Sequence, residues 1–167
     1  QALLGDLTAE ACFGGIYIID KDDQIVNALW PTPPDKRYTF HVGLDIHQQA
    51  LFWRRSLMAR IGMIDESLNF VMDLDFILRI LLNAKIIRIK SHLGMFRLHV
   101  AAKTTTIKGV SRKEHQVIRE RYERQFPSSL PLLVNRTWLR GRRLLQVIED
   151  APVAYLRFKV GRRMGMA

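Results

Sequence analysis

Two carboxylates, Asp73 and Asp75, begin a stretch whose other residues are almost all apolar, residues 73–83. Apolar residues fall on nearly every side of the predicted helix, which is typical of a buried helix. A carboxylate beside Phe70 and Met72 is partly removed from water, which raises its pKa and its strength as a base. The helix N-terminus favours negative charge and opposes that shift. We interpret Asp73 as a catalytic carboxylate at the start of a buried helix.

A purely structural interpretation of the same carboxylates stays open. Asp73 is an acceptable N-cap, and Asp75 suits the positive end of the helix dipole. Asp75 and Arg79 are four residues apart on a helix, so they can form an ion pair.

Further polar side chains stand at the ends of apolar segments. Gln48 and Gln49 precede the apolar run at residues 50–53, and His99 and Lys103 follow a predicted strand. Polar groups held at the ends of buried elements are where binding sites are usually built. These polar residues therefore indicate a binding site, although their spacing in the sequence does not define its chemistry.

Length and composition set the class of protein. The 167 residues suffice for one domain, and 48% hydrophobic and 25% charged residues are ordinary for a globular chain. No apolar run reaches the roughly 18 residues of a membrane span, and we expect a cytoplasmic protein. The lone Cys12 excludes an internal disulfide. The chain starts without Met, so we expect a fragment or a processed chain.

The expected elements alternate between strands and helices. Asp20 and Asp22 stand in the turn of a predicted hairpin, which we interpret as a solvated turn rather than a metal loop. Ser56 is the expected cap of a helical turn that ends at Gly62. The other elements are strands at 16–19, 24–29, 50–53, 85–90 and 94–99, and helices at 73–83, 111–126 and 137–150.

Five segments in a fixed order carry a family resemblance. They are Gly15–Asp20 (GIYIID), Ile46–Arg55 (IHQQALFWRR), Ile61–Leu68 (IGMIDESL), Met72–Arg79 (MDLDFILR) and Phe96–His99 (FRLH) with Lys103 and Thr104. Over residues 10–108 the chain resembles the C-terminal half of family 2 glycosyltransferases, the large inverting class with a GT-A fold. The resemblance implies an α/β fold, a partial GT-A-like mixed sheet with flanking helices, in residues 1–108. Residues 109–167 would add a basic, mainly helical extension.

The resemblance also implies roles for individual residues. Asp73, in a motif that reads Met-Asp where the family has two acids, would be the base that deprotonates the acceptor hydroxyl. The acceptor side would be lined by Gln48, Gln49 and Trp53, and Asp75 and Arg79 would brace the start of the helix. His99 would meet a metal or the diphosphate, and Lys103 would face the leaving diphosphate.

The implied reaction transfers a sugar from a nucleotide-sugar donor to a saccharide or lipid-linked acceptor with inversion, in cell-surface polysaccharide or glycolipid synthesis. The family uses a divalent metal, manganese or magnesium, and we expect its main ligands outside this chain. The Asp-x-Asp motif and the nucleotide-binding half also have no counterpart here, so we expect the chain alone to be inactive.

The net charge of +10 is concentrated in the C-terminal part of the chain. Residues 1–100 contain 11 basic and 11 acidic residues, whereas residues 101–167 contain 15 and 5. At the predicted helix of residues 137–150, Arg136, Arg140 and Arg143 fall on one side, with Trp138, Leu145 and Ile148 roughly opposite.

Three interpretations of this basic segment stay open: a solvated helical face, a peripheral contact with an anionic inner membrane face, or nucleic-acid binding. We favour the first two, because no nucleic-acid motif appears. The alternative to an enzyme is a non-catalytic basic module that binds nucleic acid or an anionic membrane. Residues 153–163 fit a strand or a basic amphipathic helix.

Overall fold

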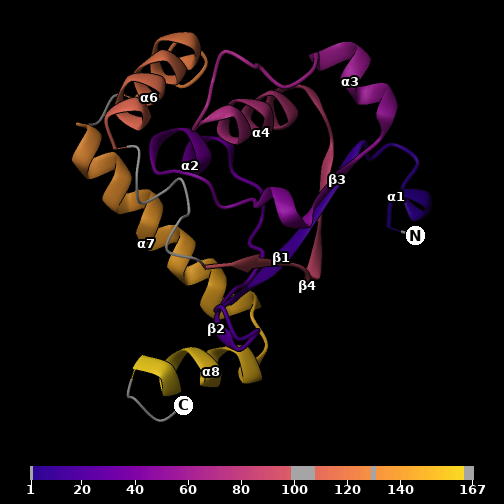
Figure 1. The fold of residues 1–167 in the computed structure, drawn as a ribbon, viewed down its shortest axis with the longest axis vertical. Helices are drawn as coiled ribbons and strands as arrows, with labels where there is room; N and C mark the ends of the chain where they lie inside the picture. The colour runs from indigo at the N-terminus through magenta and orange to yellow at the C-terminus, as the bar shows by residue number, and fades with distance from the viewer. Residues whose placement is uncertain (1, 99–107, 129–130, 164–167) are drawn as a thin grey trace.

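The computed structural model describes residues 2–98, 108–128 and 131–163, which form an α/β arrangement of one sheet with helices packed around it (Figure 1). The strands are β1 (Ala11–Ile19), β2 (Ile25–Leu29), β3 (Leu51–Trp53) and β4 (Ile86–Arg97). The helices are α1 (Ala2–Gly5), α2 (Lys36–His41), α3 (Arg55–Ile61), α4 (Met72–Asn83), α6 (Lys108–Tyr122), α7 (Leu132–Asp150) and α8 (Val153–Arg163), with a short 3-10 turn, η1 (Gln48–Ala50).

Strand β1 is the centre of a mixed sheet. One edge of β1 pairs in parallel with β4 from Ala11 to Ile19. Its other edge pairs antiparallel with β3 along its first residues and with β2 along its last residues. Most of β1 is buried because both of its edges and both of its faces are covered. The predicted hairpin of β1 and β2 is confirmed, and Asp20 Oδ1 accepts hydrogen bonds from the backbone N–H groups of Asp22 and Gln24 in its turn.

The two strands predicted at 85–90 and 94–99 are wrong in detail, because a single strand runs from Ile86 to Arg97. Between its two predicted strands, β4 has more residues than the part of β1 that it pairs with. Register shifts near Gly15 accommodate them, so the pairing of β1 with β4 continues. Gly94 allows η1 to lie against this strand. A Cβ at that position would stand 2.3 Å from the carbonyl oxygen of Gln49.

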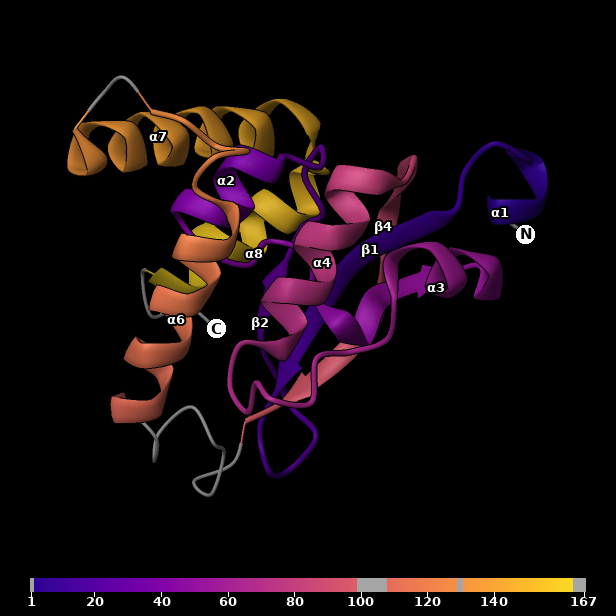
Figure 2. The same ribbon diagram turned by 90° about the horizontal axis from the view of Figure 1, so that it is seen from above.

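Helix α4 lies between two hydrophobic clusters, which confirms the predicted buried helix. Phe76, Ile77 and Ile80 pack toward the sheet, whereas Leu74 and Leu78 pack toward α6. Figure 2 shows α4 with α6 on one side and β1 and β4 on the other. Its N-cap is Val71, so the predicted capping role of Asp73, which lies inside the first turn, is wrong.

Another predicted cap is also wrong, and one helix begins earlier than predicted. Helix α3 ends at Gly62 (φ +81°) as expected, but its N-cap is Arg54 and Ser56 lies inside the helix. The helix predicted to begin at residue 111 is α6, which already includes Lys108. A local signal of two or three residues does not reveal that a helix continues upstream of it.

The basic C-terminal segment is helical, and α8 resolves the ambiguity of residues 153–163 in favour of a helix. Helix α6 packs into the body through Ile118, Tyr122 and the following Phe126, which share a cluster with α4. The composition of the chain changes near residue 108, but the segments before and after it pack into one body.

Helix α7 is docked by its arginines. Arg143 is buried between the Asp45 carboxylate, with which it forms an ion pair, and the ring of Tyr38, 4.5 Å from its guanidinium carbon. It also donates to the carbonyl of Pro33 at 2.7 Å, and Arg136 donates to the carbonyl of His41 at 2.5 Å. Burial lowers the pKa of Arg143 to about 10. A solvated arginine face is therefore wrong for these two residues.

This docking predicts a large difference between two arginines of one helix. Replacing the buried Arg143 with Met leaves Asp45 without its ion-pair partner, and we expect the free energy of unfolding to fall by about 3 kcal/mol. Arg140→Met, on the exposed side, is expected to change it by less than about 0.5 kcal/mol. Urea unfolding followed by circular dichroism measures both, and equal effects would contradict the buried ion pair.

Candidate functional site

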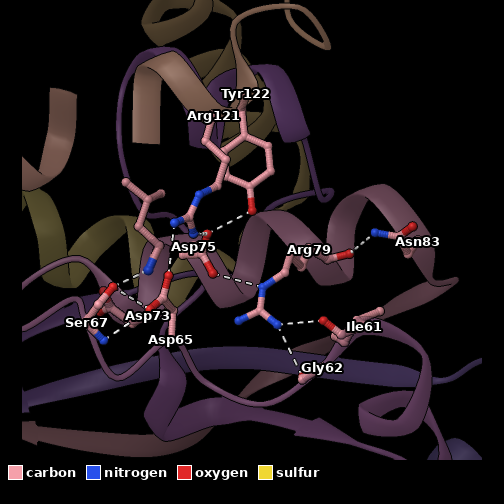
Figure 3. A network of polar contacts seen from close by, with 11 residues as sticks. Ile61, Gly62, Asp65, Ser67, Asp73, Asp75, Arg79, Asn83, Arg121 and Tyr122 are labelled. Atoms are coloured by element: carbon pink, nitrogen blue, oxygen red, sulfur yellow. Dashed lines mark hydrogen bonds and ion pairs between the residues drawn. The ribbon is translucent and has the colours of Figure 1, made fainter. Parts of the chain in front are cut away.

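The start of α4 is held by a fully buried carboxylate. Asp75 has no exposed surface, and its two oxygens accept three side-chain hydrogen bonds (Figure 3). Arg79 Nε donates to Oδ2 at 2.8 Å, while Arg121 Nη1 and the Tyr122 hydroxyl donate to Oδ1 at 2.6 Å and 2.8 Å. The predicted ion pair of Asp75 with Arg79 is present, and two donors from α6 join it.

The same two arginines also hold the loop that precedes α4. Arg79 Nη1 donates to the carbonyls of Ile61 (2.6 Å) and Gly62 (3.2 Å), and Arg121 forms an ion pair with Asp65 at 2.9 Å. Burial, and then the hydrogen bond to Asp75, raise the pKa of Tyr122 to about 12. Loop 61–65, α4 and α6 are thus tied to one buried charge.

Glu114 of α6 binds the backbone directly ahead of α4. Its carboxylate oxygens accept from the N–H groups of Asn69 (2.9 Å), Phe70 (2.7 Å) and Val71 (3.1 Å). Burial alone would raise the pKa of Glu114, but these three donors outweigh it and hold the pKa below its ordinary value. Three N–H groups that would otherwise lack partners are satisfied by a helix far along the chain.

Asp73 lies at the wall of a hollow rather than in the core or in open solvent. The hollow has a volume of about 270 Å³. Its lining residues are Gly43, Leu44, Asn69, Phe70, Val71, Asp73, Leu74 and His115. Asp73 is half-buried, and the N–H of Leu74 donates to its Oδ1 at 2.8 Å. Among residues 2–98, 108–128 and 131–163, no side chain forms an ion pair with it.

Burial raises the pKa of Asp73, and this effect outweighs the N–H of Leu74, its own N–H and the charge of His115, which favour ionisation. The direction agrees with the shift inferred from its apolar neighbours in sequence. A half-buried carboxylate with a raised pKa at the wall of a hollow has the properties of a general base.

A second hollow of about 240 Å³ shares Leu74 and His115 with the first. Its lining includes three arginines, Arg112, Arg119 and Arg136, and none of its lining residues is acidic. The Nδ1–H of His115 donates to the carbonyl of Ser111 at 2.7 Å, which leaves Nε2 for other partners. Guanidinium groups bind phosphate and carboxylate groups well.

The other predicted site residues lie away from this hollow. Gln48, Gln49 and Trp53 are not among its lining residues. Trp53 instead packs edge-on against Phe76 of α4, with ring centroids 5.1 Å apart, and η1 lies against β4. Their acceptor role stays a prediction: Trp53 lies next to Phe76 of α4, Gln49 lies against Gly94 of β4, and none of the three lines the Asp73 hollow.

His99 and Lys103 lie outside the described residues, so their predicted roles at the metal and the diphosphate stay predictions. In the part of the chain that the structure describes, no three His, Cys, Asp or Glu side chains are grouped to hold a metal ion. The described residues therefore do not fit a metal centre of their own.

Sequence reasoning missed His115 and the role of Glu114. A usable signal exists for Glu114, because Glu114, Ile118 and Tyr122 are spaced four apart and share the buried face of α6. A charged residue on an apolar helical stripe indicates a buried partner. The partner itself, a loop more than forty residues away, has no local signal.

Comparison with models of protein families finds no match to this chain, and a search of curated proteins finds none either. None of the helices in the described ranges has both the length and the apolar character that a membrane span needs.

The buried carboxylate predicts a steep loss of stability. Asp75→Ala leaves Arg79, Arg121 and Tyr122 without their acceptor, so we expect the free energy of unfolding to fall by about 3–5 kcal/mol. Tyr122→Phe removes one donor and is expected to cost about 1 kcal/mol. Chemical unfolding measures both, with the exposed Asp22→Ala as control. A loss below that of Tyr122→Phe would contradict the central role of Asp75.

Glu114 predicts a pH dependence with a defined sign. Because its folded pKa is lowered, its stabilisation is complete above the ordinary glutamate pKa and is lost as the pH falls through the folded value. We expect Glu114→Gln to lower the free energy of unfolding by about 1–3 kcal/mol at neutral pH, and by progressively less in acid.

Thermal unfolding from neutral to acidic pH measures this difference. Glu120→Gln is the matched control, since Glu120 is exposed on the same helix and accepts from Gln116. A Glu114→Gln effect that is constant with pH would show that the carboxylate charge does not hold the loop.

Proposed function

We propose that this chain is the acceptor-binding and base-bearing half of an inverting glycosyltransferase with a GT-A-like fold. The observation that carries the proposal is Asp73, a half-buried carboxylate with a raised pKa at the wall of a hollow. The five family-like segments support it, because the one with the catalytic acid forms the start of α4. The nucleotide-binding half is provided by residues outside this chain.

In the proposed reaction, Asp73 accepts the proton of an acceptor hydroxyl as that oxygen attacks the anomeric carbon of the donor. The new C–O bond forms as the bond from that carbon to the diphosphate oxygen breaks on the opposite face, so the configuration inverts. The diphosphate leaves with the electron pair, and the proton stays on the Asp73 carboxylate. The raised pKa suits a group that must accept a proton and then release it.

Asp75, Arg79 and Glu114 position the base without touching the substrate. They hold loop 61–65, the 69–71 backbone and the first turn of α4, so the direction of the Asp73 side chain is set before an acceptor binds. Such preorganisation avoids reorganisation during the reaction.

The acceptor class that suits the site is one that carries phosphate, such as a lipid-linked sugar. The support is the second hollow, where Arg112, Arg119 and Arg136 stand beside His115 and adjoin the Asp73 hollow. Three lining arginines without a lining acid suit a phosphate better than a neutral saccharide.

A divalent metal would be held mainly by groups outside this chain and would neutralise charge on the departing diphosphate. Residues 108–128 and 131–163 do not favour nucleic acid as the partner. Arg143 of α7 is buried against the body of the protein and is not available to nucleic-acid phosphates.

Asp73→Asn tests the proposal in the full-length enzyme, with release of nucleoside diphosphate from a panel of nucleotide sugars as the readout. We expect turnover to fall about a hundredfold to ten-thousandfold, because the amide cannot accept the proton. The wild-type rate should fall toward acid with an apparent pKa above that of an ordinary carboxylate. Asp22→Asn, in the exposed hairpin turn, is the matched control.

A stability measurement separates loss of the base from loss of the fold. Because burial raises the pKa of Asp73, ionising it destabilises the fold as the pH rises through the folded value. Asp73→Asn should match the wild type in acid and be slightly more stable at neutral pH. Unchanged turnover in a stably folded variant would remove Asp73 as the base.

A further inference from the structure

Helix α7 presents an apolar face to its surroundings. Six large hydrophobic side chains are each more than half exposed: Leu133, Val134, Trp138, Leu144, Leu145 and Ile148. On a helix they fall on one broad side, opposite the buried Asn135, Leu139 and Arg143. The usual polarity of a surface helix is therefore reversed, with the charged Arg143 toward the protein and apolar groups outward.

The apolar face continues onto α8. Leu144 and Ile148 of α7 and Leu156 and Val160 of α8 line one open groove of about 590 Å³, and Val153 on α8 is 64% exposed. In Figure 1, α7 runs along the outer side of the molecule and α8 lies beneath β2, at the end away from α3 and α4. The two helices thus form one continuous surface.

Both helices are fixed to the sheet by polar contacts. Asp150 at the end of α7 forms ion pairs with Arg88 (2.5 Å) and Lys90 (2.7 Å) of β4, which lower its pKa to about 2. The Tyr155 hydroxyl of α8 accepts from the N–H of Trp30 and donates to the carbonyl of Ala28, at 3.2 Å each. The apolar groups are held outward by this anchoring.

The charges around this surface are mainly positive. Residues 132–163 contain eight Lys or Arg and two Asp or Glu. Of these, Arg136 and Arg143 contact the body of the protein, Glu149 is exposed and Asp150 is paired with β4. Exposed Arg140 lies on one side of the apolar face of α7 and Arg142, which also forms an ion pair with Asp35, lies on the other, and Arg157 is exposed on α8. Arg142 also lies 5.1 Å from the ring of Trp138. Apolar side chains with a tryptophan and flanking arginines suit the boundary between lipid headgroups and acyl chains.

We propose that the outward face of α7 and α8 binds the surface of an anionic lipid bilayer. The apolar side chains enter the acyl boundary, and the flanking arginines meet anionic headgroups. The charge complementarity selects lipid over a neutral partner protein. This binding is independent of any transfer at Asp73, which lies in a different part of the fold.

The test is flotation of the 167-residue chain with vesicles of phosphatidylcholine alone or mixed with phosphatidylglycerol. We expect binding to the mixed vesicles, much weaker binding to phosphatidylcholine alone, and a partial loss at high salt because the apolar contribution remains. Leu145→Gln with Ile148→Gln should lower the partition coefficient roughly tenfold or more. Arg140→Gln should lower it about fivefold, on mixed vesicles only.

The matched control is Leu7→Gln with Met63→Gln, two apolar residues that are at least as exposed but lie on other elements. This control should bind as the wild type does. Failure to float with either vesicle, equal binding to both, or an equal loss in the control would overturn the proposal.

Sedimentation velocity without lipid separates one further outcome. If the chain forms a dimer that Leu145→Gln with Ile148→Gln abolishes, and does not float, then the face is covered by a second copy and the membrane proposal is overturned. A monomer that floats supports it.

Discussion

The structure depends on one buried charge, the carboxylate of Asp75. Three donors from two helices converge on it, and the same arginines bind the 61–65 loop. A buried carboxylate is tolerated only when its oxygens are fully hydrogen-bonded, so α4 and α6 must keep their relative position. Because Asp73 is two residues earlier on the same helical turn, its position follows from that constraint.

The two acids of this turn have opposite environments, which divides their roles. Asp75 is fully buried with every donor it needs, whereas Asp73 is half-buried, has its pKa raised by burial, and faces a hollow. Glu114 accepts hydrogen bonds from the backbone N–H groups just before α4, so Asp73 is not needed to cap them. A protein that used both acids for stability would pair both. Asp73, which is half-buried and has no ion-pair partner among the residues that the structure describes, is where an activity is best sought.

Helix α7 is likewise held in place by polar contacts. Arg136, Arg142 and Arg143 form ion pairs or carbonyl contacts with the 31–45 segment, so the outward apolar side chains are not needed to dock the helix. Six apolar side chains remain outward on a helix that is firmly held. Exposed apolar surface of this extent marks a surface that meets lipid or another molecule.

The sequence by itself determined the elements with strong local patterns: the hairpin of β1 and β2, the buried helix α4, the stop at Gly62 and the ion pair of Asp75 with Arg79. Only the tertiary structure decided that β4 is one strand, that Glu114 caps a distant loop, and that Arg143 faces inward. The reason is physical. Periodicity and turn chemistry act over a few residues, whereas the burial of a charge depends on partners forty or more residues away, which no local pattern names.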